Sequence, residues 1–272
     1  MIARTLVLVV AIVWSPMAFA ASDAELDALH DALRTNDMIR ILSDEGIADS
    51  LALQDDMFPG QGGAVWPKMV AKIYASEVMV LRFRQAFDRE MRETEVDGLL
   101  GFYQSEIGQA VTQAEVDSRQ AITSDAVEQT ARAAYAALLE NDPDRAALLD
   151  EFVVLNDLVE RNVAGAMTAN LAFFRGLAEG GAFELGETEM LTMVWEQEAE
   201  IRADTESWVG AYLTLTYDGL SDDDFRTYTE VSATTAGRAL NRALFAGFYE
   251  AFQSISFDLG RAASRFMVSE EL

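Results

Sequence analysis

Apolar side chains recur at steps of three, four or seven residues between positions 64 and 92. The stripe consists of Trp66, Val70, Ile73, Val80, Phe87 and Met91. Because an α-helix completes a turn every 3.6 residues, this spacing places all of them on one helical face. Similar patterns predict helices over 23–35, 143–179, 187–217 and 235–267. Sustained period-two alternation, which would indicate strands, is nearly absent, so we expect an all-α, multi-helix bundle.

Signals for helix N-termini divide the chain into these helices. At each signal, a hydroxyl or carboxylate oxygen can accept a hydrogen bond from the free backbone amides of the first helical turn. The signals lie at Ser22–Glu25, Thr94–Asp97, Asp142-Pro143 and Ser221–Asp224. Glycine supplies the opposite signal. We expect Gly46 to interrupt a helix and Gly165 to bend one.

A hydroxyl residue three positions before a glycine occurs at two predicted helix–helix elbows. The first elbow contains Phe102, Tyr103, Ser105 and Gly108, and the second contains Thr234 and Gly237. We interpret the hydroxyl as a helix cap and the glycine as a site of close helix approach. An offset of 129 also aligns Trp66 with Trp195. The pattern predicts one helical domain over 21–272, with repeat-like halves at about 38–140 and 167–268.

The first elbow resembles a bacterial exported family known as domain of unknown function 2059. The similarity rests on Leu99-Leu100-x-Phe102-Tyr103-x-Ser105-x-x-Gly108, and Leu220–Tyr228 with Gly237–Leu240 is a weaker second likeness. The resemblance implies an all-helical protein with a signal peptide, and the second likeness implies two copies of the domain in tandem. The resemblance gives no information about a biochemical activity.

The first twenty residues have the features of a signal peptide. Arg4 precedes an apolar run over 6–14, and Ala18 and Ala20 occupy the small-residue positions of a cleavage site after Ala20. The run is shorter than the roughly 20 residues that span a bilayer. We therefore expect a periplasmic protein without a transmembrane segment.

Charge and residue usage exclude several classes of function. The formal net charge is −26, which would repel the phosphate backbone of nucleic acid. The chain has no cysteine, and its single histidine, His30, is expected on the surface. A thiolate centre and a two-histidine di-iron site are therefore excluded. A Ser-His-Asp triad is not expected, because His30 is the sole candidate base and no Gly-x-Ser-x-Gly nucleophile elbow occurs. We expect no enzymatic activity, no cofactor and no metal site.

Two acidic residues fall on stripes that are otherwise apolar. Glu77 lies on the face of the predicted 64–92 helix, and Glu206 lies 129 positions later, four residues after Arg202. Buried carboxylates need a partner, which suggests Arg202 for Glu206 and Arg84 for Glu77. Two interpretations stay open: structural ion pairs, or a pair of acids that line a ligand-binding cavity.

Together these features favour a non-enzymatic envelope protein with a structural or interaction role. The alternative is a binder of an apolar or amphipathic ligand between the two helical repeats. The corresponding partners are another envelope protein or an apolar ligand.

Overall fold

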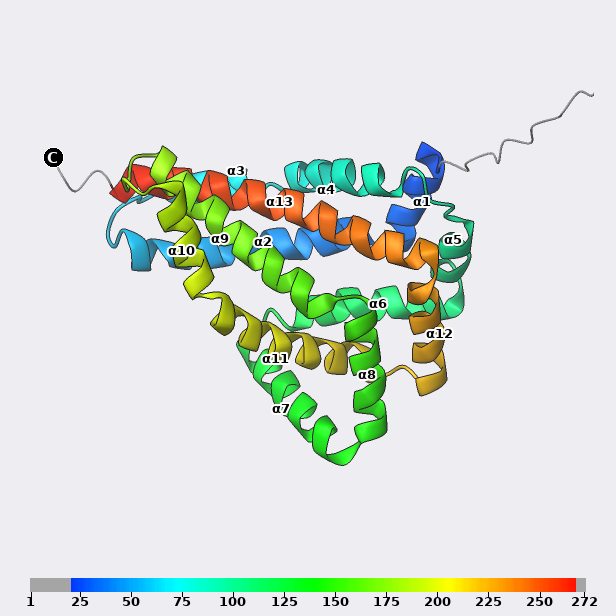
Figure 1. Cartoon of the computed structure of the whole chain (residues 1–272). Helices are drawn as coiled ribbons and strands as arrows, with labels where there is room; N and C mark the ends of the chain where they lie inside the picture. The colour runs from blue at the N-terminus through cyan, green and yellow to red at the C-terminus, as the bar shows by residue number, and fades with distance from the viewer. Residues whose placement is uncertain (1–20, 268–272) are drawn as a thin grey trace, which may run out of the picture.

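The computed structural model describes residues 21–267, and within this range it contains thirteen α-helices and no β-strand (Figure 1). The all-α prediction is confirmed. The helices are α1 (Asp23–Ala32), α2 (Thr35–Met57), α3 (Val65–Ile73), α4 (Ser76–Met91), α5 (Asp97–Tyr103), α6 (Glu106–Ala121), α7 (Asp125–Asn141), α8 (Pro143–Leu155), α9 (Leu158–Glu179), α10 (Glu187–Glu196), α11 (Glu198–Tyr217), α12 (Asp222–Ala233) and α13 (Thr235–Met267).

The longest helix, α13, organises the packing. It runs along the length of the molecule between α4 and α9, and its contacts with these two helices are the most extensive in the fold (Figure 1). Helices α11, α7 and α8 form a lower layer. One continuous cluster of buried side chains extends from Leu26 in α1 to Ala263 in α13. We refer to α1–α7 as the first half and to α8–α13 as the second half.

Two glycines allow α9 and α13 to cross at backbone distance. A Cβ atom on Gly176 would overlap the carbonyl oxygen of Phe257, and one on Gly260 would overlap the carbonyl oxygen of Phe173. Each glycine therefore lies against the backbone of the opposite helix. This reciprocal contact holds the C-terminal part of α13 against α9.

Three predicted helices are broken where the sequence pattern continues. The 64–92 helix ends at Ile73 and restarts at Ser76, and the carbonyl of Tyr74 accepts a hydrogen bond from Ser43 Oγ at 2.6 Å. The 187–217 helix breaks at Gln197. The 143–179 helix breaks before Asp157, which adopts a left-handed conformation with φ 55°. Apolar periodicity does not report such short interruptions, because buried residues continue on both sides.

The two glycines expected to disturb helices lie inside continuous ones. Gly46 is within α2 and Gly165 is within α9. Each lies under a tyrosine ring, that of Tyr74 and of Tyr249 respectively, at a distance that leaves no space for a Cβ atom. These glycines therefore permit close packing and do not end a helix.

Both elbows have the expected geometry. Ser105 Oγ accepts a hydrogen bond from Gly108 N at 3.2 Å, and Thr234 Oγ1 accepts one from Gly237 N at 2.9 Å. In each elbow a Cβ atom on the glycine would overlap a carbonyl oxygen of the preceding helix. The capping role is thus confirmed, and the tandem duplication itself stays a prediction.

The cap at Ser105 should be measurable. We expect Ser105→Ala to lower the free energy of unfolding by about 1 kcal/mol, because the amide of Gly108 loses its acceptor. Ser124 is the matched control: it occupies the N-cap of α7, and its side chain makes no capping hydrogen bond. Urea denaturation should show little change for Ser124→Ala. Equal losses in the two variants would contradict the assignment.

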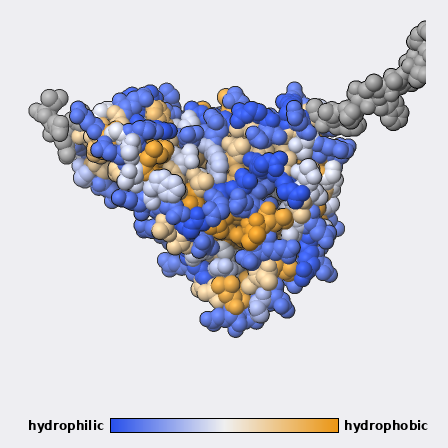
Figure 2. Space-filling model, viewed as in Figure 1, coloured by the Kyte–Doolittle hydropathy of each residue, from blue (hydrophilic) through white to orange (hydrophobic). Residues whose placement is uncertain are grey.

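The predicted signal peptide, residues 1–20, lies outside the described residues. Between residues 21 and 267, no helix combines the length and the apolar character required to cross a membrane. Hydrophilic side chains cover most of the face in Figure 2, and apolar ones gather over the junction of α8 and α9, where Val154 is 71% exposed.

Candidate functional site

The acids singled out from the sequence do not lie in the core. Glu77 and Glu206 are both exposed, so the expectation that their carboxylates point inward is wrong. The break after Ile73 resets the helical phase and turns Glu77 outward. Glu206 lies within the continuous helix α11 and is exposed beside the buried Val209. Glu206 lines a surface cavity with Tyr135 and Glu160, and Glu77 is not part of that cavity.

The expected arginine partners form other ion pairs. Arg84 pairs with Asp27 of α1, and Arg202 pairs with Glu160 and Glu198. Neither predicted pair, Glu77 with Arg84 or Glu206 with Arg202, is formed in the structure. These four residues therefore do not constitute a site.

His30 is buried, which corrects the expectation of a surface histidine. It is 1% exposed, its Nε2 lies 2.8 Å from Asp88 Oδ1, and its Nδ1 lies 3.2 Å from Thr35 Oγ1. Burial lowers its pKa and outweighs the opposite effect of Asp88. These contacts join α1 to α4, so the role of His30 is structural.

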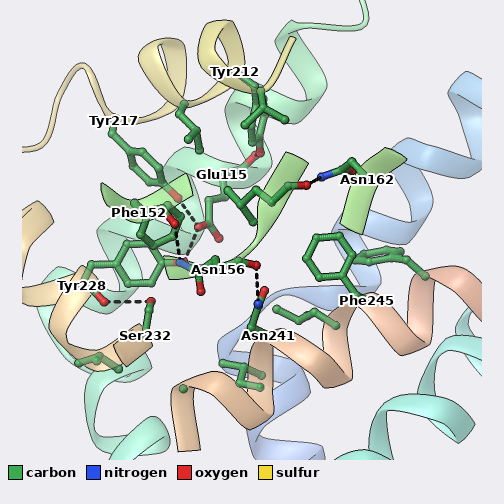
Figure 3. Close-up of a pocket in the computed structure, with 18 of the residues that line it drawn as sticks. Glu115, Phe152, Asn156, Asn162, Tyr212, Tyr217, Tyr228, Ser232, Asn241 and Phe245 are labelled. Carbon is green, nitrogen blue, oxygen red and sulfur yellow. Dashed lines mark hydrogen bonds between the residues drawn. The ribbon is translucent and has the colours of Figure 1, made fainter. Parts of the chain in front are cut away.

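A cavity of about 290 Å³ lies between the two halves (Figure 3). The first half contributes Tyr103 from α5 and Glu115 from α6 to its wall. The second half contributes residues of α8, α9, α11, α12 and α13, among them Phe152, Asn156, Asn162, Tyr212, Tyr217, Tyr228, Ser232, Asn241 and Phe245. Most of the wall is therefore apolar or aromatic, and Glu115 is its single acidic residue.

Two tyrosine hydroxyls hold the carboxyl group of Glu115. Tyr217 and Tyr228 both donate to Oε1, at 2.7 and 3.0 Å. Tyr212 donates to the backbone carbonyl of Glu115 at 2.9 Å. The carboxyl group of the first half is thus fixed by α11 and α12 of the second half (Figure 3).

The electrostatics of this carboxyl group are unusual. Burial raises the pKa of Glu115, and the two tyrosine hydrogen bonds act in the opposite direction. No arginine, lysine or histidine of the described residues compensates its charge. Glu115 nevertheless keeps some accessible surface, because it faces the cavity. Burial and the negative charge of Glu115 also raise the pKa values of Tyr217 and Tyr228 well above normal.

Glu115 is not among the predicted site residues, although the sequence contains a signal for it. Gly108, Val111 and Thr112 are buried on one face of α6, and Glu115 follows at the next step of three or four residues. The helical periodicity that singled out Glu77 therefore also singles out Glu115, and α6 is a continuous helix. The tyrosine partners come from positions about a hundred residues later and have no local signal.

A second, apolar compartment of about 490 Å³ adjoins the cavity. The two share Asn162, Trp208, Tyr212, Phe245 and Phe248. The outer compartment continues along Met38, Leu42, Gly165, Ala166, Ala169, Tyr249 and Phe252. Its charged residue, Arg119, pairs with Glu45 and lies over the ring of Trp208. An apolar surface compartment thus lies next to the cavity that contains the Glu115 carboxyl group.

The raised pKa of Glu115 predicts a specific pH dependence of stability. A carboxyl group whose pKa is higher in the folded state binds its proton more tightly there, so stability falls as pH rises from about 4.5 through the folded-state pKa. Each unit of difference between the two pKa values costs about 1.4 kcal/mol. Glu115→Gln removes this contribution and keeps a similar shape. The free energy of unfolding of Glu115→Gln minus that of the parent protein should therefore increase with pH and then level off. A constant difference from pH 4 to pH 8 would contradict a raised pKa of Glu115.

The arrangement offers few groups for chemistry beyond binding. Within residues 21–267, no set of three or more acidic or histidine side chains is placed to hold a metal ion. The tyrosines beside Glu115 have raised pKa values and stay protonated near neutral pH, so they cannot serve as bases there.

Comparison with known proteins supports the resemblance noted in the sequence. The sequence model of a bacterial family, described as an uncharacterized protein conserved in bacteria (DUF2059), matches residues 77–136. No curated protein and no solved structure matches the chain. The matched segment spans α4 to α7 and includes the first elbow and Glu115. Residues 77–136 are thus similar to the DUF2059 family.

Proposed function

We propose that the protein binds an amphipathic small molecule in the two joined compartments between its halves and performs no catalysis. The observation that carries this proposal is the Glu115 carboxyl group, held by Tyr217 and Tyr228 in a largely apolar cavity that adjoins an apolar surface compartment. A polar head group would lie at Glu115. The apolar part of the ligand would extend along α9 and α13.

The dimensions support this assignment. Small-molecule sites generally occupy about 300–1,000 Å³ and combine apolar walls with a few convergent polar groups. The inner compartment, at about 290 Å³, holds the polar groups, and the outer one, at about 490 Å³, is lined mainly by aromatic and aliphatic side chains. A ligand with one polar end and one chain fits this division better than a compact polar metabolite does.

The proposed location is the periplasm, on the basis of the leader-like segment at residues 1–20. A strongly acidic surface would keep such a carrier dispersed and away from anionic surfaces. A binding protein of this kind would shield an amphiphile from water between two membranes.

Titration with N-phenyl-1-naphthylamine, which fluoresces in apolar sites, tests this proposal. Ala169 lines the outer compartment, so Ala169→Trp should fill it and weaken probe binding at least tenfold. Ala164 lies exposed on the same helix and is not part of either compartment, so Ala164→Trp is the matched control. Absence of probe binding to the parent, or equal binding to both variants, would refute the proposal.

A protein-interaction role is the second candidate. It is favoured by Leu191 and Trp195 of α10, which are 39% and 66% exposed, and by the nearby Phe183. Exposed apolar groups of this size are typical of contact surfaces for other proteins. This candidate becomes the better one if the probe titration fails.

A further inference from the structure

The polar atoms left free in the inner compartment are hydrogen-bond acceptors. Asn156, Asn162 and Asn241 each use the side-chain amide nitrogen to donate to a backbone carbonyl, at 3.0, 2.8 and 2.8 Å (Figure 3). Their Oδ1 atoms have no hydrogen-bond partner within residues 21–267. The wall therefore presents three amide oxygens without a donor.

Glu115 adds a fourth and stronger acceptor. Both tyrosine hydroxyls donate to Oε1, which leaves Oε2 without a hydrogen bond from the described residues. Oε2 is not a buried unpaired atom, so it retains access to the cavity. It is the natural anchor for a group that carries donors.

The hydroxyl donors around these acceptors are already committed. The protons of Tyr217 and Tyr228 go to Glu115 Oε1, that of Tyr212 goes to the Glu115 carbonyl, and Ser232 donates to the Tyr228 carbonyl at 3.1 Å. A ligand head group that offers only acceptors would therefore leave Glu115 Oε2 and the amide oxygens of Asn156 and Asn241 unpaired in the cavity, whereas the exposed Asn162 can bind water. Unpaired buried polar groups are costly.

We propose that the ligand of this site is an amphiphile with a protonated amine head group, and that its ammonium ion pairs with Glu115 Oε2. This inference rests on the proposed function and specifies its ligand class. An ammonium group supplies three N–H donors and the positive charge that the wall lacks. The aromatic rings of Tyr103, Phe152 and Phe245 line the same space and favour a cation over a neutral group.

Binding of such a ligand is coupled to the proton of Glu115. Where Glu115 is protonated, entry of the ammonium displaces that proton to solvent and leaves a carboxylate–ammonium pair. The other titratable groups that face this carboxyl are Tyr103, Tyr212, Tyr217 and Tyr228, all with pKa values raised by burial. Arg119 lies in the adjoining compartment and is paired with Glu45.

Three ligands that share a decyl chain and differ in their head groups distinguish the contribution of the head group to binding from that of the tail. Decylammonium, 1-decanol and decanoate, each below its aggregation limit, are titrated by displacement of N-phenyl-1-naphthylamine. In the parent protein we expect decylammonium to displace the probe at a concentration at least tenfold below that of decanol, with decanoate weakest. Glu115→Gln should abolish the advantage of decylammonium. Glu140→Gln, at an exposed position on α7, should retain it.

A calorimetric measurement on the parent protein gives an independent test that needs no variant. The heat of decylammonium binding, compared between buffers of different ionisation enthalpy over a series of pH values, should reveal proton release wherever free Glu115 is protonated, and no release at higher pH. Equal binding of decanol and decylammonium would overturn the amine assignment and leave the proposed function in place. Tightest binding of decanoate would assign the polar contact to Arg119 and also overturn it. If none of the three displaces a probe that does bind, the amphiphile function itself fails.

Discussion

Gly260→Ala is expected to destabilise the protein by about 3 kcal/mol, because the added methyl group meets a backbone carbonyl at the crossing of α9 and α13. The opposing atom belongs to Phe173 and cannot rotate away as the end of a side chain would. Relief requires the two helices to separate, and their contact is the largest between any two helices of the described fold. Gly176→Ala should have a similar effect from the other side.

Chemical denaturation of purified variants measures this loss directly. Gly101→Ala is the matched control, since Gly101 is exposed in α5 and a Cβ atom there meets nothing within 4 Å. Alanine at that position should leave stability unchanged or raise it by up to about 1 kcal/mol. Retention of full stability in both Gly176→Ala and Gly260→Ala would show that α9 and α13 do not cross as described.

Trp66→Ala is expected to cost about 3–5 kcal/mol, as the loss of a fully buried large side chain generally does. The indole of Trp66 is 0% exposed and packs edge-on against Phe58 and Phe266. Its Nε1 donates to the carbonyl of Ser50 at 2.9 Å, and this hydrogen bond would be lost. Urea denaturation monitored by circular dichroism should show the loss.

The corresponding change at Trp195 should have almost no effect on stability. Trp195 is 66% exposed near the end of α10, so its replacement by alanine removes few contacts. The pair of variants thus separates two tryptophans that a constant offset of 129 treats as equivalent. Comparable losses in both variants would support that equivalence and contradict the described burial.

The difference between these tryptophans shows how far a repeat can be followed in sequence. The elbows at Ser105 and Thr234 are 129 positions apart, and they share a cap and a glycine contact. The left-handed residues that join α1 to α2 and α8 to α9, Arg34 and Asp157, are only 123 positions apart. A single offset therefore cannot align both features. The offset of 129 pairs Trp66, the second residue of α3, with Trp195, the ninth residue of α10, so the two tryptophans occupy different positions in their helices.

Helix class and caps were predictable because their causes are local. Helical periodicity and a capping oxygen act over a few residues, and the caps at Ser22, Ser105, Asp142 and Ser221 form. The cap expected at Thr94–Asp97 is wrong, because Val96 occupies the N-cap of α5 and makes no side-chain capping hydrogen bond. The position of helix breaks was less accessible, because a tertiary contact such as that of Ser43 with Tyr74 decides it. Burial of His30 likewise depends on Asp88, a partner 58 residues away.

The candidate site was only partly within reach of the sequence. Glu115 lies on the buried face of α6, and periodicity alone would have selected it. Its importance comes from Tyr217 and Tyr228, which reach it from helices of the other half. Glu77 satisfied the same pattern and proved exposed, because the break before α4 changed the helical phase. A periodic pattern identifies a buried carboxylate only when the helix is continuous.

A crystal structure of the protein with a bound decyl amphiphile that carries a terminal bromine tests the central claim most directly. We expect an anomalous bromine peak in the outer compartment between α9 and α13, near Ala169 and Phe252, with the head group in the inner compartment beside Glu115. A bromine peak confined to exposed apolar side chains such as those of α10, with both compartments free of ligand density, would contradict it.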